Sequence, residues 1–147
     1  MCMVIFPIRN PKSPEIYIMS GYMAPALMKS SDDLIEYWVK DSSTVDPNAK
    51  KGYSERFIHG EIFRVYPEVS CVMHSHAEAV LPYAAAVHVP MTPIFHMAGF
   101  LGSQVPIFDI AKVYEPGDQR DMLVRTARFG TALAKTFSQI RTQLLLL

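Results

Sequence analysis

The chain has 147 residues, of which 50% are apolar and 19% charged, and its 14 Lys and Arg residues balance its 14 Asp and Glu residues. A chain of this length and composition builds a core without disulfides, which excludes disordered and fibrous classes. A neutral chain gives no overall field to hold nucleic acid or an anionic membrane surface, so neither partner is expected. No apolar stretch approaches the roughly 20 residues of a membrane-spanning helix. We expect one soluble globular domain.

Two features of the N-terminal half indicate a cytoplasmic protein. Cys2 and Cys71 are too few for a disulfide framework, and each lies in an apolar run typical of a reduced, packed thiol. The apolar start, Met1–Ile8, has no charged segment before it and is followed by Arg9 rather than a small-residue cleavage site. We therefore expect no signal peptide.

The first third of the chain predicts strands. Met3–Ile8 and Glu15–Met19 are apolar and partly β-branched, and the proline-rich turn between them predicts an antiparallel pair. A third strand is expected at Leu34–Val39, because turn residues flank it on both sides. The polar stretch from Lys40 to Gly52 is expected to be a surface loop.

A helix and a short strand are predicted next. Ser54 is a candidate N-cap for a helix through about Tyr66, because apolar residues recur at helical spacing until Pro67. Val69–Met73 is then expected to be a short buried strand that carries His74 and His76 at its end.

The second half predicts two helices and two strands. Ala77–Ala86 has helical character, with a possible kink at Pro82, and Asp121–Ser138 has the longest helical pattern. Met91–Phe95 and Val105–Ile110 are predicted strands. Because helices and strands alternate only in part, we expect a mixed sheet covered by helices rather than a purely parallel one.

The C-terminal end is atypical. We assign residues 1–139 to the domain and residues 140–147 to a tail that closes with four leucines. This tail is interpreted either as a strand that begins where the chain stops or as an unnatural end of the reading.

The strongest chemical signal is the pair His74 and His76. Side chains at positions i and i+2 of a strand project to the same side, close enough to bind one ion. Imidazole suits zinc and similar divalent metals, and a third protein ligand is then expected. The alternative is two polar residues at the end of a strand.

Glu55 is the candidate for that third ligand. It lies in the first turn of the helix that leads back to the histidine-bearing strand, so its carboxylate can fold toward the metal. The alternative is a glutamate that merely interacts with the helix dipole and neighbouring amides.

The residues Ser54–His59, Tyr66–Val69 and Cys71–His76 together resemble the central motif of the class II aldolase/adducin family in composition, order and spacing. The resemblance covers the chain from about Phe6 to about Ser138. It implies an α/β fold with three layers, α/β/α, and a central mixed, largely antiparallel sheet, here incomplete.

The resemblance also implies roles for single residues. His74 and His76 would be zinc ligands, and Glu55 would approach the metal and act as acid and base. His59, one helical turn after Glu55 on the same face, would lie next to the metal ligands and orient the site. His96 falls near the place where related aldolases carry a tyrosine that donates a proton in a neighbouring subunit's site, although a packed or surface histidine fits it equally well.

The chain departs from the family pattern at both ends. The family's third zinc-binding histidine follows the long helix, and here no histidine follows His96. The family's first helix and glycine-asparagine loop are also missing, and Ser20-Gly21 is what would remain of a second anion-binding turn. The chain thus resembles the middle of the family domain, and unpaired sheet edges favour a homo-oligomer.

The predicted function is that of a zinc-dependent aldolase-type lyase, which cleaves or forms a carbon–carbon bond next to a carbonyl in a small hydroxy-carbonyl substrate. A decarboxylase or epimerase would use the same chemistry, since fold resemblance does not choose among reactions. The second hypothesis is a non-catalytic, adducin-like interaction module, which the missing histidine favours. A nucleic-acid role is the weakest.

Overall fold

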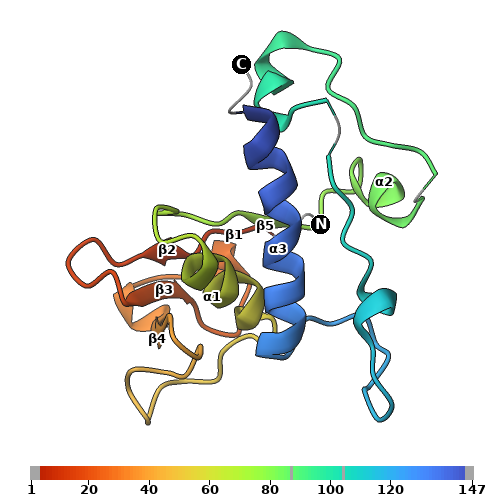
Figure 1. Ribbon diagram of the computed structural model, residues 1–147. Helices are drawn as coiled ribbons and strands as arrows, with labels where there is room; N and C mark the ends of the chain where they lie inside the picture. Colours follow the sequence, from red (N-terminus) through yellow and green to blue (C-terminus); the bar gives the residue numbers. More distant parts are fainter. Residues whose placement is uncertain (1–3, 87, 104, 145–147) are drawn as a thin grey trace.

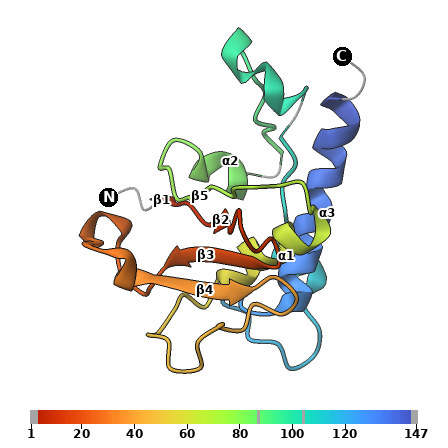
Figure 2. The same cartoon turned by 90° about the vertical axis from the view of Figure 1, so that its left-hand side faces the viewer.

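A computed structural model of the chain describes residues 4–86, 88–103 and 105–144. Its centre is a three-stranded sheet, with helices α1 and α3 packed together on one face (Figures 1 and 2). The order in this sheet is β2 (Ile8–Arg9), β3 (Ile16–Ser20) and β4 (Leu34–Trp38). A second, two-stranded sheet pairs β1 (Val4–Ile5) with β5 (His74–Ser75). The predicted largely antiparallel α/β architecture is confirmed, and every described strand pair is antiparallel.

The predicted N-terminal strand is two short strands in the structure. β1 pairs with the histidine-bearing β5, whereas β2 pairs with β3 as the sequence predicts. Pro7 lies between them and cannot donate a backbone hydrogen bond to a continuous ladder. This split allows one apolar run to join the three-stranded sheet to the strand that carries the candidate site.

Helix α1 (Arg56–Val65) covers the face of the sheet that carries the buried tyrosines. In the β3–β4 register Tyr17 lies opposite Tyr37, and their rings stack with centroids 5.2 Å apart. The Tyr17 hydroxyl donates a hydrogen bond of 3.1 Å to the backbone carbonyl of Arg56. Gly60 permits this close approach, because a Cβ there would lie 1.9 Å from Ser42 Oγ. The start of α1 is therefore fixed to the sheet.

Helix α3 (Ala127–Leu144) packs across α1. Gly130 meets the backbone of Phe57 so closely that an added Cβ would lie 2.4 Å from its carbonyl oxygen. Beside this contact the buried Glu61 carboxylate accepts hydrogen bonds from Arg64 and from the Thr131 hydroxyl, the latter at 2.6 Å. The pairing gives α1 a rigid backing on the side away from the sheet.

Arg9 holds the connection from α1 to β5. Its guanidinium donates to the carbonyl of Phe63 at 2.7 Å and to that of Val69 at 3.0 Å. The last carbonyls of a helix lack partners within the helix, so a cation there is favourable. Arg9 thus fixes the path along which the chain enters the histidine-bearing strand.

Three predicted strands are wrong in the structure. Residues 69–73 form an extended segment with a single bridge, Ile8 to Cys71, and only Val72 is buried. Met91–Phe95 and Val105–Ile110 form no strand, and the Val105 amide makes one hydrogen bond of 3.2 Å to the Met91 carbonyl. Prolines at positions 90, 93 and 106 remove the donors that a ladder needs.

Two predicted helices are shorter or shifted. α2 is Leu81–Ala85, with Pro82 in its first turn rather than at a kink. α3 begins at Ala127, six residues later than predicted, because Asp121 binds the amide of Leu123 in a local turn and the Thr126 hydroxyl accepts from the amide of Phe129. The short 3-10 helices are η1 (Pro25–Leu27), η2 (Ser31–Asp33), η3 (His96–Leu101) and η4 (Ile110–Val113).

Other sequence expectations concern the ends of the chain. Residues 140–144 of the predicted tail continue α3, while residues 145–147 and Cys2 lie outside the described residues. Cys71 is a free thiol but is exposed, so the prediction of a packed thiol is wrong there. Within the described ranges, none of the helices has the length and apolar character needed to cross a bilayer.

Candidate metal centre

Glu55 occupies the N-cap position of α1, one residue later than the predicted cap Ser54. Its side chain makes no capping hydrogen bond to the helix. The carboxylate is therefore not committed to the amides of the first turn, where N-cap side chains usually bind. It is half-buried and lies instead beside His74 of β5 and His76, which follows that strand.

His74 and His76 lie where β5 ends, and their side chains point to the same side. The two Nε2 atoms are 3.0 Å apart. Two nitrogens bound to one tetrahedral zinc ion, each at about 2.0–2.1 Å, would be about 3.3 Å apart. The pair thus has the separation of two ligands of one ion to within a few tenths of an ångström.

The structure brings the three predicted ligands together. One ligand atom from each of Glu55, His74 and His76 lies within 4.8 Å of the other two. Two imidazoles and a carboxylate form a donor set that zinc and other divalent transition metals accept. The residues therefore fit the metal that the family resemblance implies, and the identity of the ion stays a prediction.

The electrostatics of the cluster favour a neutral, metal-binding imidazole at His74. Burial lowers the pKa of His74, an effect that the Glu55 carboxylate opposes and the neighbouring His76 reinforces. A histidine must lose its second proton before it binds a metal, so a lowered pKa keeps the lone pair available at neutral pH.

His59 lies behind the cluster and is fully buried, with 0% of its surface exposed. Its ring centroid is 5.5 Å from that of His74, and neither of its ring nitrogens has a hydrogen-bond partner among the described residues. Burial lowers the pKa of His59 to about 3, with a smaller contribution from His74, so the ring is neutral.

His96 is not brought to the cluster within one chain. It begins η3, is exposed, and contacts the ring of Phe95 with centroids 4.3 Å apart. Both views place this segment well away from β5 (Figures 1 and 2). A role for His96 in the same chain's site therefore has no geometric support, and a role in a second subunit's site stays a prediction.

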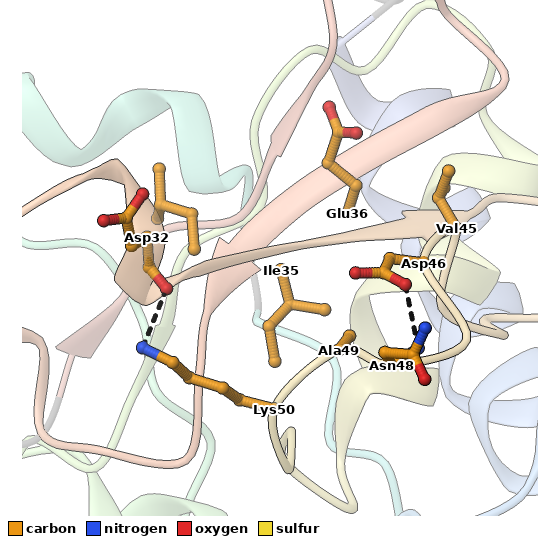
Figure 3. Close-up of a pocket in the computed structure, with 9 residues that line it drawn as sticks. Asp32, Ile35, Glu36, Val45, Asp46, Asn48, Ala49 and Lys50 are labelled. Carbon is orange, nitrogen blue, oxygen red and sulfur yellow. Dashed lines mark hydrogen bonds between the residues drawn. The ribbon is translucent and has the colours of Figure 1, made fainter.

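A cavity of about 640 Å³ opens beside the start of α1. Ser54 and Arg56, the neighbours of Glu55 in sequence, line it together with Lys51 and Tyr22. Its two cations favour an anionic ligand. The sequence alone does not single them out, because Lys51 lies in a stretch with the composition of a surface loop. A second cavity, of about 430 Å³ along β4, lies among exposed residues such as Asp32, Glu36 and Lys50 and includes none of the candidate site residues (Figure 3).

The expected anion turn at Ser20-Gly21 differs from the prediction. The Gly21 amide donates to the Asp33 carbonyl at 2.7 Å, and the Tyr22 amide donates to the Lys51 carbonyl at 2.9 Å. These backbone donors are thus engaged within the protein. The cationic side chains of the neighbouring cavity are better placed to meet an anion.

Comparison with known proteins identifies the family of this chain. Residues 8–147 match the family model of the class II aldolase and adducin N-terminal domain. "Decarboxylase tropJ" of Talaromyces stipitatus is 50% identical over 131 residues, which are 89% of this chain and 49% of that protein. The chain therefore spans about half the length of this curated relative. The structure of an L-fuculose 1-phosphate aldolase superposes with a TM-score of 0.60 at 10% identity, over 97% of this chain and 74% of that one. On the family match and the shared α/β fold together, the chain is a member of the class II aldolase and adducin family.

Proposed function

We propose that this protein is a metal-dependent lyase that breaks a carbon–carbon bond next to the carbonyl of a small substrate, and that the reaction is a decarboxylation. The observation that carries the proposal is the convergence of Glu55, His74 and His76 within 4.8 Å. Decarboxylation is preferred over aldol cleavage because a relative that is 50% identical carries the name decarboxylase.

His74 and His76 would hold the ion through their Nε2 atoms, with Glu55 completing the protein ligands. A bound divalent ion would supply positive charge that polarises the carbonyl oxygen of the substrate, and the two imidazoles and one carboxylate favour zinc as that ion. The β1–β5 pairing holds the backbone at His74, and the Arg9 contacts fix the path of the chain that enters β5.

Glu55 would move the proton. As carbon dioxide leaves, the electron pair of the broken bond remains on the carbon next to the carbonyl, and that carbon must then be protonated. A Glu55 carboxyl beside the reacting carbon can deliver this proton and recover one from solvent. Its half-buried position at the N-cap, without a capping bond, leaves it free to change partners.

The cationic cavity supports an acidic substrate. Lys51 and Arg56 line it beside the start of α1, and its volume of about 640 Å³ matches that of small-molecule sites. A carboxylate entering this cavity would meet two positive charges. This arrangement agrees with a substrate that carries the group to be lost.

Aldol cleavage is the second candidate, because it leaves the same electron pair on the same carbon and needs the same ion and acid. The name of the family favours aldol cleavage. The structural similarity to the aldolase concerns the fold only and does not bear on the reaction. An epimerase is the remaining enzymatic option, and a non-catalytic, adducin-like module is the alternative that an absence of metal would favour.

The test uses the full chain loaded with zinc, with metal content measured before and after dialysis. A panel of small carboxylated carbonyl compounds is assayed for released carbon dioxide, and hydroxy-carbonyl compounds for aldehyde. We expect turnover by the wild-type protein, metal loss in His74→Ala, and bound metal without turnover in Glu55→Gln. Absence of tightly bound metal in the wild-type protein would contradict the proposal.

Self-association is a further part of the proposal. Residues 79–108 contain no Asp, Glu, Lys or Arg, and Ile94, Phe95 and Phe100 are exposed there by 97%, 58% and 65%. A patch without charges can meet a second copy of itself without like-charge repulsion. Light scattering should report an oligomer, and a concentration-independent monomer would contradict this.

A cytoplasmic location also stays a prediction, tested by imaging a tagged chain.

A further inference from the structure

The buried histidine behind the site has no use in the mechanism proposed above. His59 is fully buried, and both of its ring nitrogens lack a hydrogen-bond partner within the described part of the chain. A buried polar group without a partner is costly, so its presence calls for an explanation. Nδ1 of His74, the next ring, is also buried and has no partner among the residues that the structure describes.

We propose that His59 is a positioning residue whose ring accepts a hydrogen bond from Nδ1–H of His74 and thereby directs Nε2 of His74 toward the metal. The inference rests on the proposed function, because it concerns how one of the proposed ligands is held. One such hydrogen bond would satisfy two of the three buried ring nitrogens that lack partners.

The distances allow this hydrogen bond. The His59 and His74 ring centroids are 5.5 Å apart, whereas those of His74 and His76 are 5.0 Å apart and bring two nitrogens to 3.0 Å. Two imidazoles at such a separation reach hydrogen-bond length when a nitrogen of one ring faces a nitrogen of the other. The proposal therefore requires the His59 ring to turn one nitrogen toward Nδ1 of His74.

The chemistry of imidazole sets the direction of the bond. When Nε2 of His74 binds the proposed ion, a neutral His74 carries its proton on Nδ1. A metal-bound histidine usually donates this second N–H to a fixed acceptor, which sets the tautomer and the ring orientation. Here the acceptor would be a second imidazole, that of His59, instead of the more usual carboxylate or backbone carbonyl.

The first test measures zinc affinity by competition with a chelator. His59→Phe keeps a buried ring but removes both nitrogens, and we expect its affinity to fall by about 10–100-fold. His59→Gln restores an acceptor and should recover part of that loss. A merely structural role predicts no loss of zinc affinity in His59→Phe, since a phenyl ring in place of an unpartnered imidazole leaves the metal-free protein equally stable or more so. Zinc affinity of His59→Phe within twofold of wild type would overturn the proposal.

The spectrum of bound Co²⁺ separates positioning from direct ligation. Positioning predicts that His59→Phe retains the coordination number of the wild-type protein. Loss of a nitrogen ligand in this variant would overturn the proposal in favour of direct ligation by His59.

A second measurement does not depend on metal. Nitrogen NMR of the metal-free protein labelled at histidine reports the tautomer of each ring, with His74 assigned by its absence in His74→Ala. We expect His74 to carry its proton on Nδ1 in the wild-type protein and to shift toward the Nε2–H form in His59→Phe. If wild type binds no metal, the proposed function fails, and this tautomer still decides the role of His59. An Nε2–H form in wild type would overturn it even if the variant does not fold.

Discussion

The contact between α1 and α3 at Gly130 provides a quantitative test of how the helix that carries Glu55 is held. A Cβ at Gly130 would lie 2.4 Å from the Phe57 carbonyl oxygen and 2.8 Å from Glu61 Cγ. The first of these neighbours is helix backbone and cannot move aside alone, so the two helices must separate. Overpacking of this kind costs up to about 3 kcal/mol, and alanine recovers about 1 kcal/mol in helix propensity.

Gly130→Ala should therefore lower the free energy of unfolding by about 2 kcal/mol, or the melting temperature by about 4–8 °C for a chain of this size. Circular dichroism during urea and thermal unfolding measures both quantities. Gly99→Ala is the matched control, because an added Cβ there meets nothing within 4 Å. A Gly130→Ala protein that melts at or above the wild-type temperature would refute the packing of α1 against α3.

Three further predictions concern the site and its support. Glu55→Gln should bind zinc, although more weakly, and lose at least about 100-fold in turnover, because an amide cannot move a proton; turnover near wild type would remove Glu55 from the chemistry. The pKa of His59 is lowered from 6.5 to about 3, so the unfolded chain takes up its proton first as the pH falls. Its contribution to stability is complete above pH 6.5 and is lost as the pH falls toward about 3, by at most about 1.4 kcal/mol per pH unit. Urea unfolding of metal-free protein should show a shallower acid slope for His59→Phe than for wild type, and equal slopes would contradict burial of that ring. Arg9→Lys should lower the free energy of unfolding by about 2 kcal/mol, since an ammonium cannot reach the carbonyls of Phe63 and Val69 together. Unchanged unfolding of this variant would show that those bonds contribute nothing.

The geometry of the site could be predicted from the sequence because its determinants are local. Two histidines at positions i and i+2 of a strand share a side whatever the rest of the fold does. Glu55 begins the helix that precedes this strand, so a short unit suffices to bring its carboxylate near. The family motif gave the same three residues, and their roles stay predictions.

The features that the sequence could not predict depend on distant contacts. Nothing local to Gly130 indicates that Phe57 lies against it, and the four carbonyl partners of the Arg9 side chain come from two other segments. The apolar stretches at residues 91–95 and 105–110 have strand composition, yet their prolines outweigh it. Two of these errors had a signal in the sequence. The prolines argue against the two predicted strands, and Thr126 is a candidate N-cap that marks the start of α3.

Zinc-edge X-ray absorption of the loaded protein shows whether two imidazoles and one carboxylate bind a single ion. We expect two imidazole ligands and at least one oxygen at about 2.0–2.1 Å, with the imidazole signal reduced in His76→Ala. A shell of oxygen atoms alone, unchanged by that substitution, would contradict it.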